Sequence, residues 1–101
     1  MSGGEDFGRR LQDRVMFITG AASGIGTAIA RRCAAEGAMV ACADRDGEGA
    51  DRLADALGSH ALPLPCDVTD PDSIGDAVRH AHAHFRRLDG LVHNRPHRPT
   101  R

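Results

Sequence analysis

A turn with three glycines stands between two patterned segments early in this chain, and it constrains the fold more than any other feature. Val15–Thr19 is a short apolar run, which predicts a strand that is buried on both faces. From Gly24 to about Glu36 the apolar residues recur with helical spacing. Between Gly20 and Gly26 the glycines follow the spacing G-x-x-x-G-x-G. A strand that enters a helix through such a turn predicts an α/β fold.

Apolar runs and helical patterns continue to alternate after this turn. The first helix carries its apolar stripe on Ile25, Ile29 and Cys33. The segment from Met39 to Ala43 predicts a second strand, and the segment from Gly47 to Leu57 predicts a second helix. Two strand-helix units therefore occupy the first half of the chain.

A third strand and a third helix follow. The segment from Ala61 to Val68 fits a strand, and Pro63 and Pro65 place it at a sheet edge because each lacks an N–H donor. Asp70 before Pro71 predicts an N-cap with proline at the first helical position. The apolar stripe of this helix is Ile74, Ala77, Val78, Ala81, Phe85 and Leu88.

A last strand is expected from Leu88 to His93, after which the composition turns to arginine and proline. The expected organisation is a flexible leader (1–10), one α/β domain (11–94) and an irregular tail (95–101). Alternating strands and helices predict parallel pairing through right-handed crossovers. We expect a sheet of about four strands in the order 3-2-1-4, with the first two helices on one face and the third on the other.

Composition excludes several other classes of protein. With 101 residues the chain can bury one small core. A net charge of -1 and three aromatic residues, all Phe, do not favour nucleic-acid binding. No apolar run could span a membrane and the N-terminal segment is too polar for a signal peptide, so we expect a cytoplasmic location and no membrane partner.

Cysteine and histidine spacings do not predict a metal site. The spacing of Cys33, Cys42 and Cys66 matches neither a disulfide framework nor a metal knuckle. We interpret the three cysteines as small residues that fill the core. His80 and His84 would share a helix face, but they have no obvious third ligand and a solvated face explains them more simply. We expect no metal.

The glycine-rich turn has the chemistry of a phosphate-binding loop. Glycine lets backbone N–H groups approach a diphosphate, and the following helix offers unpaired N–H donors and the positive end of its dipole. Three glycines and a serine are more than a structural turn requires. The candidate residues are Gly20, Ala22, Ser23, Gly24, Ile25 and Gly26.

Residues after the second and third expected strands are candidates to bind the adenine and its ribose. Asp44 stands where a carboxylate can accept hydrogen bonds from the adenine ribose and repel a 2'-phosphate, which favours NAD over NADP. Arg45 keeps NADP open, because a guanidinium can pair with a 2'-phosphate. Asp67 and Val68 would lie on the adenine side of the crevice. Capping by Asp44 and turn formation by Asp67 are the structural alternatives.

Together these segments resemble the N-terminal half of the short-chain dehydrogenases/reductases. The family marks are T-G-x-x-x-G-x-G, a strand-end acid, a D-V pair and an N-A-G turn, matched here by Thr19–Gly26, Asp44, Asp67-Val68 and Asn94. The resemblance covers residues 11–94 and implies a Rossmann-type three-layer half-fold that binds NAD(P). It also implies that the neighbourhood of Asn94 contacts the ribose of the cofactor.

The chain departs from the family pattern directly after Asn94. Arg95-Pro96 replaces the small Ala-Gly pair, which adds bulk and removes an N–H. The family's catalytic serine and Tyr-x-x-x-Lys pair belong to later segments, and the 101 residues contain no tyrosine and no lysine. By resemblance the function is that of an oxidoreductase, and we expect no catalytic residues and no dehydrogenase activity from this chain alone.

Other functions remain open at this stage. The chain could be a non-catalytic module that binds a dinucleotide or docks a partner, or a frame-shifted fragment without function. A methyltransferase of similar topology would have its glycines closer together after the first strand, so the G-x-x-x-G-x-G spacing speaks against this function. An uncovered sheet face and a free edge strand would also permit self-association.

Overall fold

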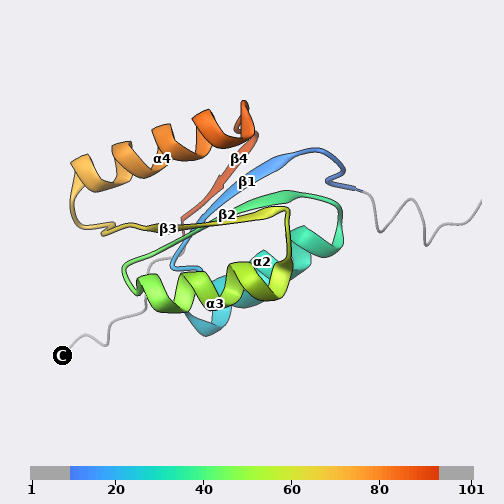
Figure 1. Ribbon diagram of the computed structural model, residues 1–101, viewed down its shortest axis with the longest axis horizontal. Helices are drawn as coiled ribbons and strands as arrows, with labels where there is room; N and C mark the ends of the chain where they lie inside the picture. The colour runs from blue at the N-terminus through green and yellow to red at the C-terminus, as the bar shows by residue number, and fades with distance from the viewer. Residues whose placement is uncertain (1–9, 94–101) are drawn as a thin grey trace, which may run out of the picture.

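The computed structural model describes residues 10–93, which form a four-stranded parallel sheet with three helices (Figure 1). The strands are ordered β3-β2-β1-β4, which confirms the predicted order. Residues 1–9 of the expected leader, Asn94 and the expected tail with Arg95-Pro96 lie outside the described residues. The elements are β1 (Val15–Thr19), α2 (Gly24–Ala35), β2 (Met39–Asp44), α3 (Gly47–Leu57), β3 (Ala61–Pro65), α4 (Pro71–Phe85) and β4 (Gly90–Val92).

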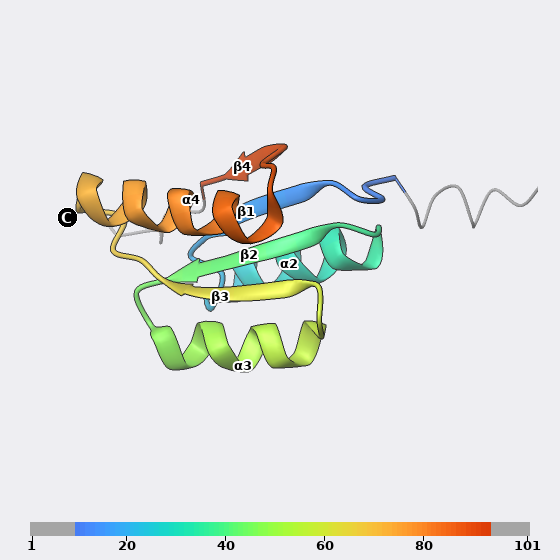
Figure 2. The same ribbon diagram turned by 45° about the horizontal axis from the view of Figure 1, so that its top comes forward.

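Helices cover both faces of the sheet. Helices α2 and α3 lie on one face and α4 lies on the other, as predicted (Figures 1 and 2). Successive side chains of a strand point to opposite faces, so β1 serves two cores. Ile18 lies in the cluster with Ala30 of α2 and Leu53 of α3, while Phe17 lies in the cluster with Ala81 of α4.

Each helix begins at a polar cap. Ser23 and Asp46 accept hydrogen bonds from the backbone of the first turns of α2 and α3. Asp70 caps α4 and Pro71 follows it, as the sequence predicts. Helix α4 ends at Phe85, and the left-handed backbone of the next residue, Arg86 (φ 71°), turns the chain back towards the sheet.

Two predicted strands are shorter than expected. β3 ends at Pro65 rather than Val68, because the Asp67 carboxylate accepts hydrogen bonds from both the N–H and the hydroxyl of Thr69 and forms a turn. β4 comprises only Gly90–Val92 instead of the range from Leu88 to His93. Leu88 packs against the cluster under α4 and therefore does not extend the strand.

The expected place of Ile25 in the apolar stripe of α2 is wrong. Its side chain is 69% exposed. The buried residues of α2 are Gly26, Ala30 and Cys33. Contact between Gly26 and the turn fixes the rotation of α2 about its axis. Ile25 is one residue earlier, so its side chain points about 100° around this axis from Gly26 and away from the sheet.

The two edges of the sheet differ. Cys66 donates its N–H to Asp44 of β2, so by alternation Pro63 and Pro65 face the outer edge of β3, where a missing donor costs nothing. This confirms the predicted edge position. On the opposite edge β4 leaves Leu91 58% exposed. No helix among residues 10–93 is long and apolar enough to cross a lipid bilayer.

Candidate functional site: a glycine-rich turn at the carboxyl edge of the sheet

The glycine-rich turn joins the carboxyl end of β1 to α2. Gly20 has a positive φ of 64°, a conformation that glycine adopts without strain. Gly26 contacts the same turn so closely that a Cβ atom there would lie 1.9 Å from the Gly20 carbonyl oxygen. Glycine at position 26 is therefore required for the helix to start where it does.

Gly24 has different surroundings. A Cβ atom at this position would meet nothing within 4 Å among the described residues. Packing inside the chain therefore does not require glycine here. The open space in front of Gly24 leaves the backbone accessible to a molecule outside the fold.

Two carbonyl groups of the turn are hydrogen-bonded within the chain. The Gly20 carbonyl accepts from the Ser23 hydroxyl at 2.7 Å and from the Ser23 N–H at 3.1 Å. The Ala21 carbonyl accepts from the Thr27 hydroxyl at 2.6 Å. Carbonyl oxygens repel anions, and these hydrogen bonds hold two of them away from the outer surface of the turn.

The N–H groups at the start of α2 are the complementary half of this arrangement. The Gly26 N–H donates to the Ser23 hydroxyl at 3.3 Å. The N–H groups of Gly24 and Ile25 have no acceptor within residues 10–93, as expected for the first turn of a helix. Free donors and the helix dipole give this surface a positive potential without a charged side chain.

Asp44 ties the end of β2 to the glycine-rich turn. One carboxylate oxygen accepts from the Ala22 N–H at 2.8 Å, and the other accepts from the Asp46 N–H at 2.8 Å. The capping alternative does not hold, because Asp46 rather than Asp44 caps α3. The structure thus places a carboxylate directly beside the turn.

The other predicted residues lie after β2 and β3. Arg45 is exposed, and its charge contributes to lowering the pKa of Asp67. The main cause of that lowered pKa is the pair of hydrogen bonds from Thr69 to the Asp67 carboxylate. Val68 is half-buried against the cluster under α4. The structure therefore brings Asp44 to the turn, while Asp67 forms a turn of its own.

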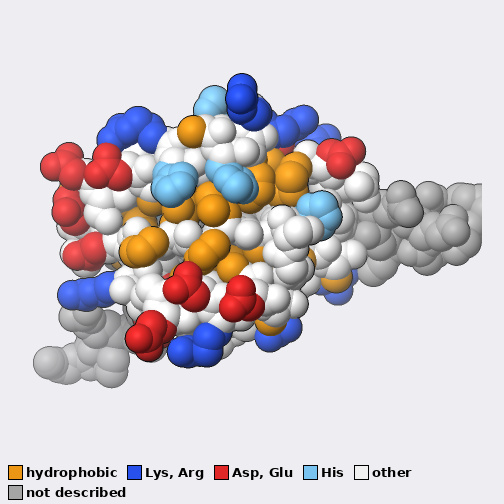
Figure 3. Space-filling model, in the orientation of Figure 1, with side chains coloured by type: hydrophobic (Ala, Val, Ile, Leu, Met, Phe, Trp, Pro, Cys, Tyr) orange, Lys and Arg blue, Asp and Glu red, His pale blue; other side chains and the backbone are white. Residues whose placement is uncertain are grey.

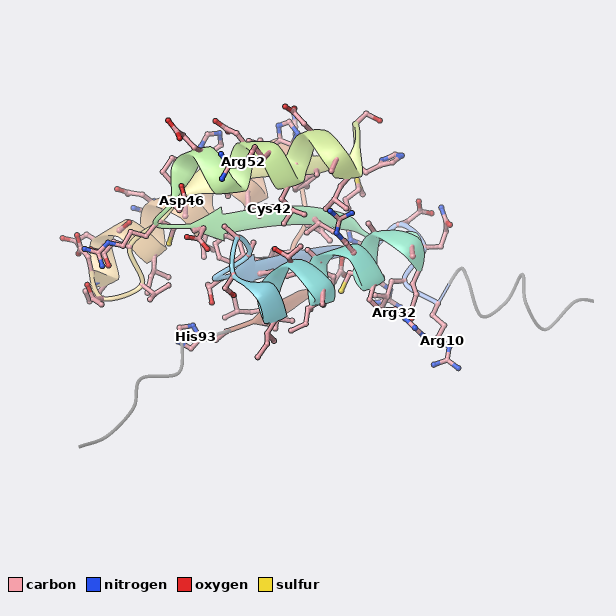
Figure 4. The ribbon with its side chains drawn as sticks, turned by 90° about the horizontal axis from the view of Figure 1, so that it is seen from below. Arg10, Arg32, Cys42, Asp46, Arg52 and His93 are labelled. Carbon is pink, nitrogen blue, oxygen red and sulfur yellow. The ribbon has the colours of Figure 1, made fainter. Side chains whose placement is uncertain are left out.

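Two residues near the site were not singled out from the sequence, and a third, His93, was expected only as the end of the last strand. Thr27 and Asp46 had no signal beyond their positions in the first turn of α2 and before α3. His93 follows β4, and its Nδ1 is hydrogen-bonded to the hydroxyl of the buried Thr19 at 3.2 Å. Figure 4 shows Asp46 and His93 at the carboxyl ends of the strands, with Arg10 at the amino ends.

Other parts of the described chain offer less chemistry. A pocket of about 230 Å³ lies at the amino ends of the strands, remote from the glycine-rich turn, and is lined by residues that include Gln12, Asp13, Met39 and His60. Within residues 10–93, no three His, Cys, Asp or Glu side chains form a group that could hold a metal ion. The three cysteines are free thiols and buried, which confirms them as core residues.

Comparison with known families decides the ancestry. The family model described as short chain dehydrogenase matches residues 14–98. The chain is a member of the short-chain dehydrogenase family. Short-chain dehydrogenases bind a nicotinamide cofactor, and the glycine-rich turn of this chain stands at the start of the match.

Individual short-chain dehydrogenases agree over most of this chain. D-threitol dehydrogenase of Mycolicibacterium smegmatis is 44% identical over 92 residues, which are 88% of this chain and 35% of that enzyme. Cis-4-hydroxycyclohexanecarboxylate dehydrogenase of Sinomonas cyclohexanicum is 48% identical and is covered to 36%. The chain therefore spans about a third of the length of these relatives.

A solved short-chain dehydrogenase structure has the same arrangement. The 3-ketoacyl-(acyl-carrier-protein) reductase of Brucella melitensis, complexed with NADH, superposes with a TM-score of 0.78 and 40% identity. The superposition covers 80% of this chain and 33% of the reductase. The Rossmann-type arrangement predicted from the sequence is thereby confirmed.

Proposed function

We propose that this chain binds a nicotinamide dinucleotide across the carboxyl edge of its sheet, with the diphosphate on the glycine-rich turn. The observation that carries the proposal is the polarity of the turn: the Gly20 and Ala21 carbonyls are hydrogen-bonded within the chain, and the N–H groups of Gly24 and Ile25 have no acceptor among the described residues. A diphosphate fits such a surface because it offers several acceptor oxygens and negative charge. The Asn94 segment would complete the site next to the ribose.

The preferred cofactor is NAD rather than NADP. The Asp44 carboxylate lies beside the turn through its hydrogen bond with the Ala22 N–H, where the adenine ribose would follow the diphosphate. A carboxylate there accepts from ribose hydroxyls and repels a 2'-phosphate. Arg45 would favour NADP, but its side chain is exposed, and Asp67 supplies a negative charge near it. Val68 and Asp67 would border the adenine.

Short-chain dehydrogenases transfer hydride between the nicotinamide ring and an alcohol or carbonyl substrate. We propose this oxidoreductase role for the chain by descent. The described residues bind and orient the dinucleotide. Proton transfer to the substrate would need the family's Tyr-x-x-x-Lys pair. These 101 residues contain no tyrosine and no lysine, so binding is the property to test. The location proposed for the chain is the cytoplasm.

The test is a titration of the 101-residue chain with NAD and, separately, with NADP, followed by amide NMR spectra. We expect a dispersed spectrum in which NAD shifts the resonances from Gly20 to Gly26 and leaves those of α4 unchanged. Asp55→Asn, at an exposed position of α3, is a matched control for changes of surface charge. A dispersed spectrum that neither nucleotide changes would show that the turn is a relic of ancestry.

Self-association is a second property that we propose for the chain. The Leu91 side chain is 58% exposed on β4, and no strand within residues 10–93 pairs with the outer side of β4. Apolar side chains also lie along β3 between α4 and α3 (Figure 3). An exposed edge strand with an apolar residue favours pairing between chains.

We expect sedimentation velocity to show concentration-dependent dimers, and Leu91→Lys to reduce them. Lysine on an edge strand opposes pairing because its charge would have to be desolvated. Ala83→Lys, on the exposed side of α4, is the control for added charge. Equal sedimentation of the wild type and of Leu91→Lys at all concentrations would contradict pairing through β4.

A further inference from the structure

One peptide unit of the glycine-rich turn, the one that joins Ala21 to Ala22, is held by side chains at both of its polar groups. The Ala21 carbonyl accepts from the Thr27 hydroxyl at 2.6 Å. The Ala22 N–H donates to the Asp44 carboxylate at 2.8 Å. A trans peptide is planar and its C=O and N–H point in opposite directions, so the two hydrogen bonds together fix the rotation of this plane.

The two side chains that hold this peptide come from different elements. Thr27 belongs to the start of α2, and Asp44 is the last residue of β2. The second Asp44 oxygen accepts from the Asp46 N–H, which anchors the carboxylate at the end of β2 as well. The peptide therefore connects the start of α2 with the carboxylate that faces the ribose in the proposed binding mode.

The Ala21 carbonyl depends on the Thr27 hydroxyl for a hydrogen bond. Ala21 is fully buried, and no other described residue donates to its carbonyl. A buried carbonyl without a donor costs free energy, which a rotation of the peptide plane would relieve. The same rotation would withdraw the Ala22 N–H from Asp44 and would turn a carbonyl oxygen, which repels anions, out of the fold.

We infer that Thr27 is a positioning residue for the dinucleotide, which acts through the peptide between Ala21 and Ala22 to hold the Asp44 carboxylate beside the turn. The inference rests on the proposed function and deepens it, because Asp44 accounts there for the preference for NAD over NADP. Thr27 thus sets how strictly the two nucleotides are discriminated. Its hydroxyl, rather than its bulk, carries this role.

The first readout is amide hydrogen exchange of the ligand-free 101-residue chain, followed by NMR. Thr27→Val removes the hydroxyl and keeps the β-branched shape. We expect it to speed exchange of the Ala22 amide by roughly twofold to tenfold, the range of one hydrogen bond. The Ala21 amide, which donates to the Ala43 carbonyl of β2, should keep its rate. A general loss of stability would speed exchange of both amides.

The second readout is the pair of dissociation constants for NAD and NADP. We expect Thr27→Val to weaken NAD binding and to narrow the ratio of the two constants by roughly twofold to tenfold. A loosened Asp44 accepts less well from the ribose and repels a 2'-phosphate less strongly. A residue that only stabilised the fold would weaken both nucleotides by the same factor. Thr27→Ser retains the hydroxyl and should restore both the ratio and the Ala22 exchange rate.

Two further variants keep the result interpretable. Ala28→Val, at the exposed next position of α2, introduces the same side chain away from the turn and should change neither readout. Thr27→Ala removes the hydroxyl with less bulk and replaces Thr27→Val if that variant gives no dispersed spectrum. If the wild type binds neither NAD nor NADP, the proposed function fails. If the wild type binds NAD while Thr27→Val leaves the Ala22 exchange rate and the ratio unchanged, the inference about Thr27 alone is overturned.

Discussion

Gly26 and Gly24 are two residues apart in one turn, yet their structural roles differ. A Cβ atom at position 26 would lie 1.9 Å from a backbone oxygen, and a Cβ atom at position 24 would meet nothing within 4 Å. The first glycine serves the fold. Packing among the described residues does not require the second, which we propose faces the dinucleotide. The G-x-x-x-G-x-G pattern alone does not separate these two roles.

Alanine substitution should separate them. Gly26→Ala forces the backbone of the turn to move, and we expect it to lower the free energy of unfolding by about 1–3 kcal/mol, the usual cost of overpacking. Gly24→Ala should keep or raise stability by up to about 1 kcal/mol, because alanine favours helix more than glycine does. It should nevertheless weaken NAD binding. Urea unfolding and the NAD titration measure both quantities, and a destabilised Gly24→Ala would contradict the assignment.

At the scale of secondary structure, the sequence was sufficient to predict the strand order and the sheet face that each helix covers. Apolar runs separated by amphipathic segments determine both, because parallel strands need crossovers of one hand. The sequence could not set the rotation of α2, since a four-residue repeat that begins at Ile25 does not show that Gly26 contacts the turn. Nor could it show the Thr19–His93 contact, which joins residues 74 positions apart.

Strands β1 and β4 are also joined by a carboxylate. Asp89 accepts a bidentate hydrogen bond from Arg87 and a further one from the Val15 N–H at 2.8 Å. The Arg87 hydrogen bond, followed by that from Val15, lowers the pKa of Asp89 from 3.8 to about 2. The unfolded chain therefore binds a proton before the folded chain does as the pH falls.

This difference predicts a pH dependence of stability. The contribution of Asp89 is present above about pH 4 and is lost between about pH 4 and pH 2, because the folded pKa is the lower one. We expect Asp89→Asn to be less stable than wild type at pH 7 and to lose less stability over this acid range. Thermal unfolding at several pH values measures it, with Asp55→Asn as the control. Parallel curves for wild type and Asp89→Asn would refute the linkage.

At the scale of the whole molecule, the cysteines report on both cores. Cys33 and Cys42 lie in the cluster under α2 and α3, while Cys66 lies in the cluster under α4. Burial raises the pKa of all three thiols, and that of Cys42 to about 11. Native thiols should therefore react very slowly with a thiol reagent at neutral pH.

We expect all three thiols to become reactive at one urea concentration, because a small single domain unfolds cooperatively. The two cores share the sheet, so loss of α4 would expose β1 and β2 as well. Mass spectrometry after a short alkylation pulse gives the labelled fraction of each cysteine. Labelling of Cys66 at lower urea than Cys33 and Cys42 would show instead that α4 detaches first.

The prolines of β3 limit how large any assembly of this chain can become. Pro63 and Pro65 face the outer edge of β3 without N–H groups, so that edge cannot continue the hydrogen-bond ladder of another copy. Two copies paired through their β4 strands would form one continuous sheet that ends in a proline-bearing β3 on each side. Growth through strand pairing therefore stops at two copies, because the β4 edge permits a dimer and the β3 edge excludes a fibre.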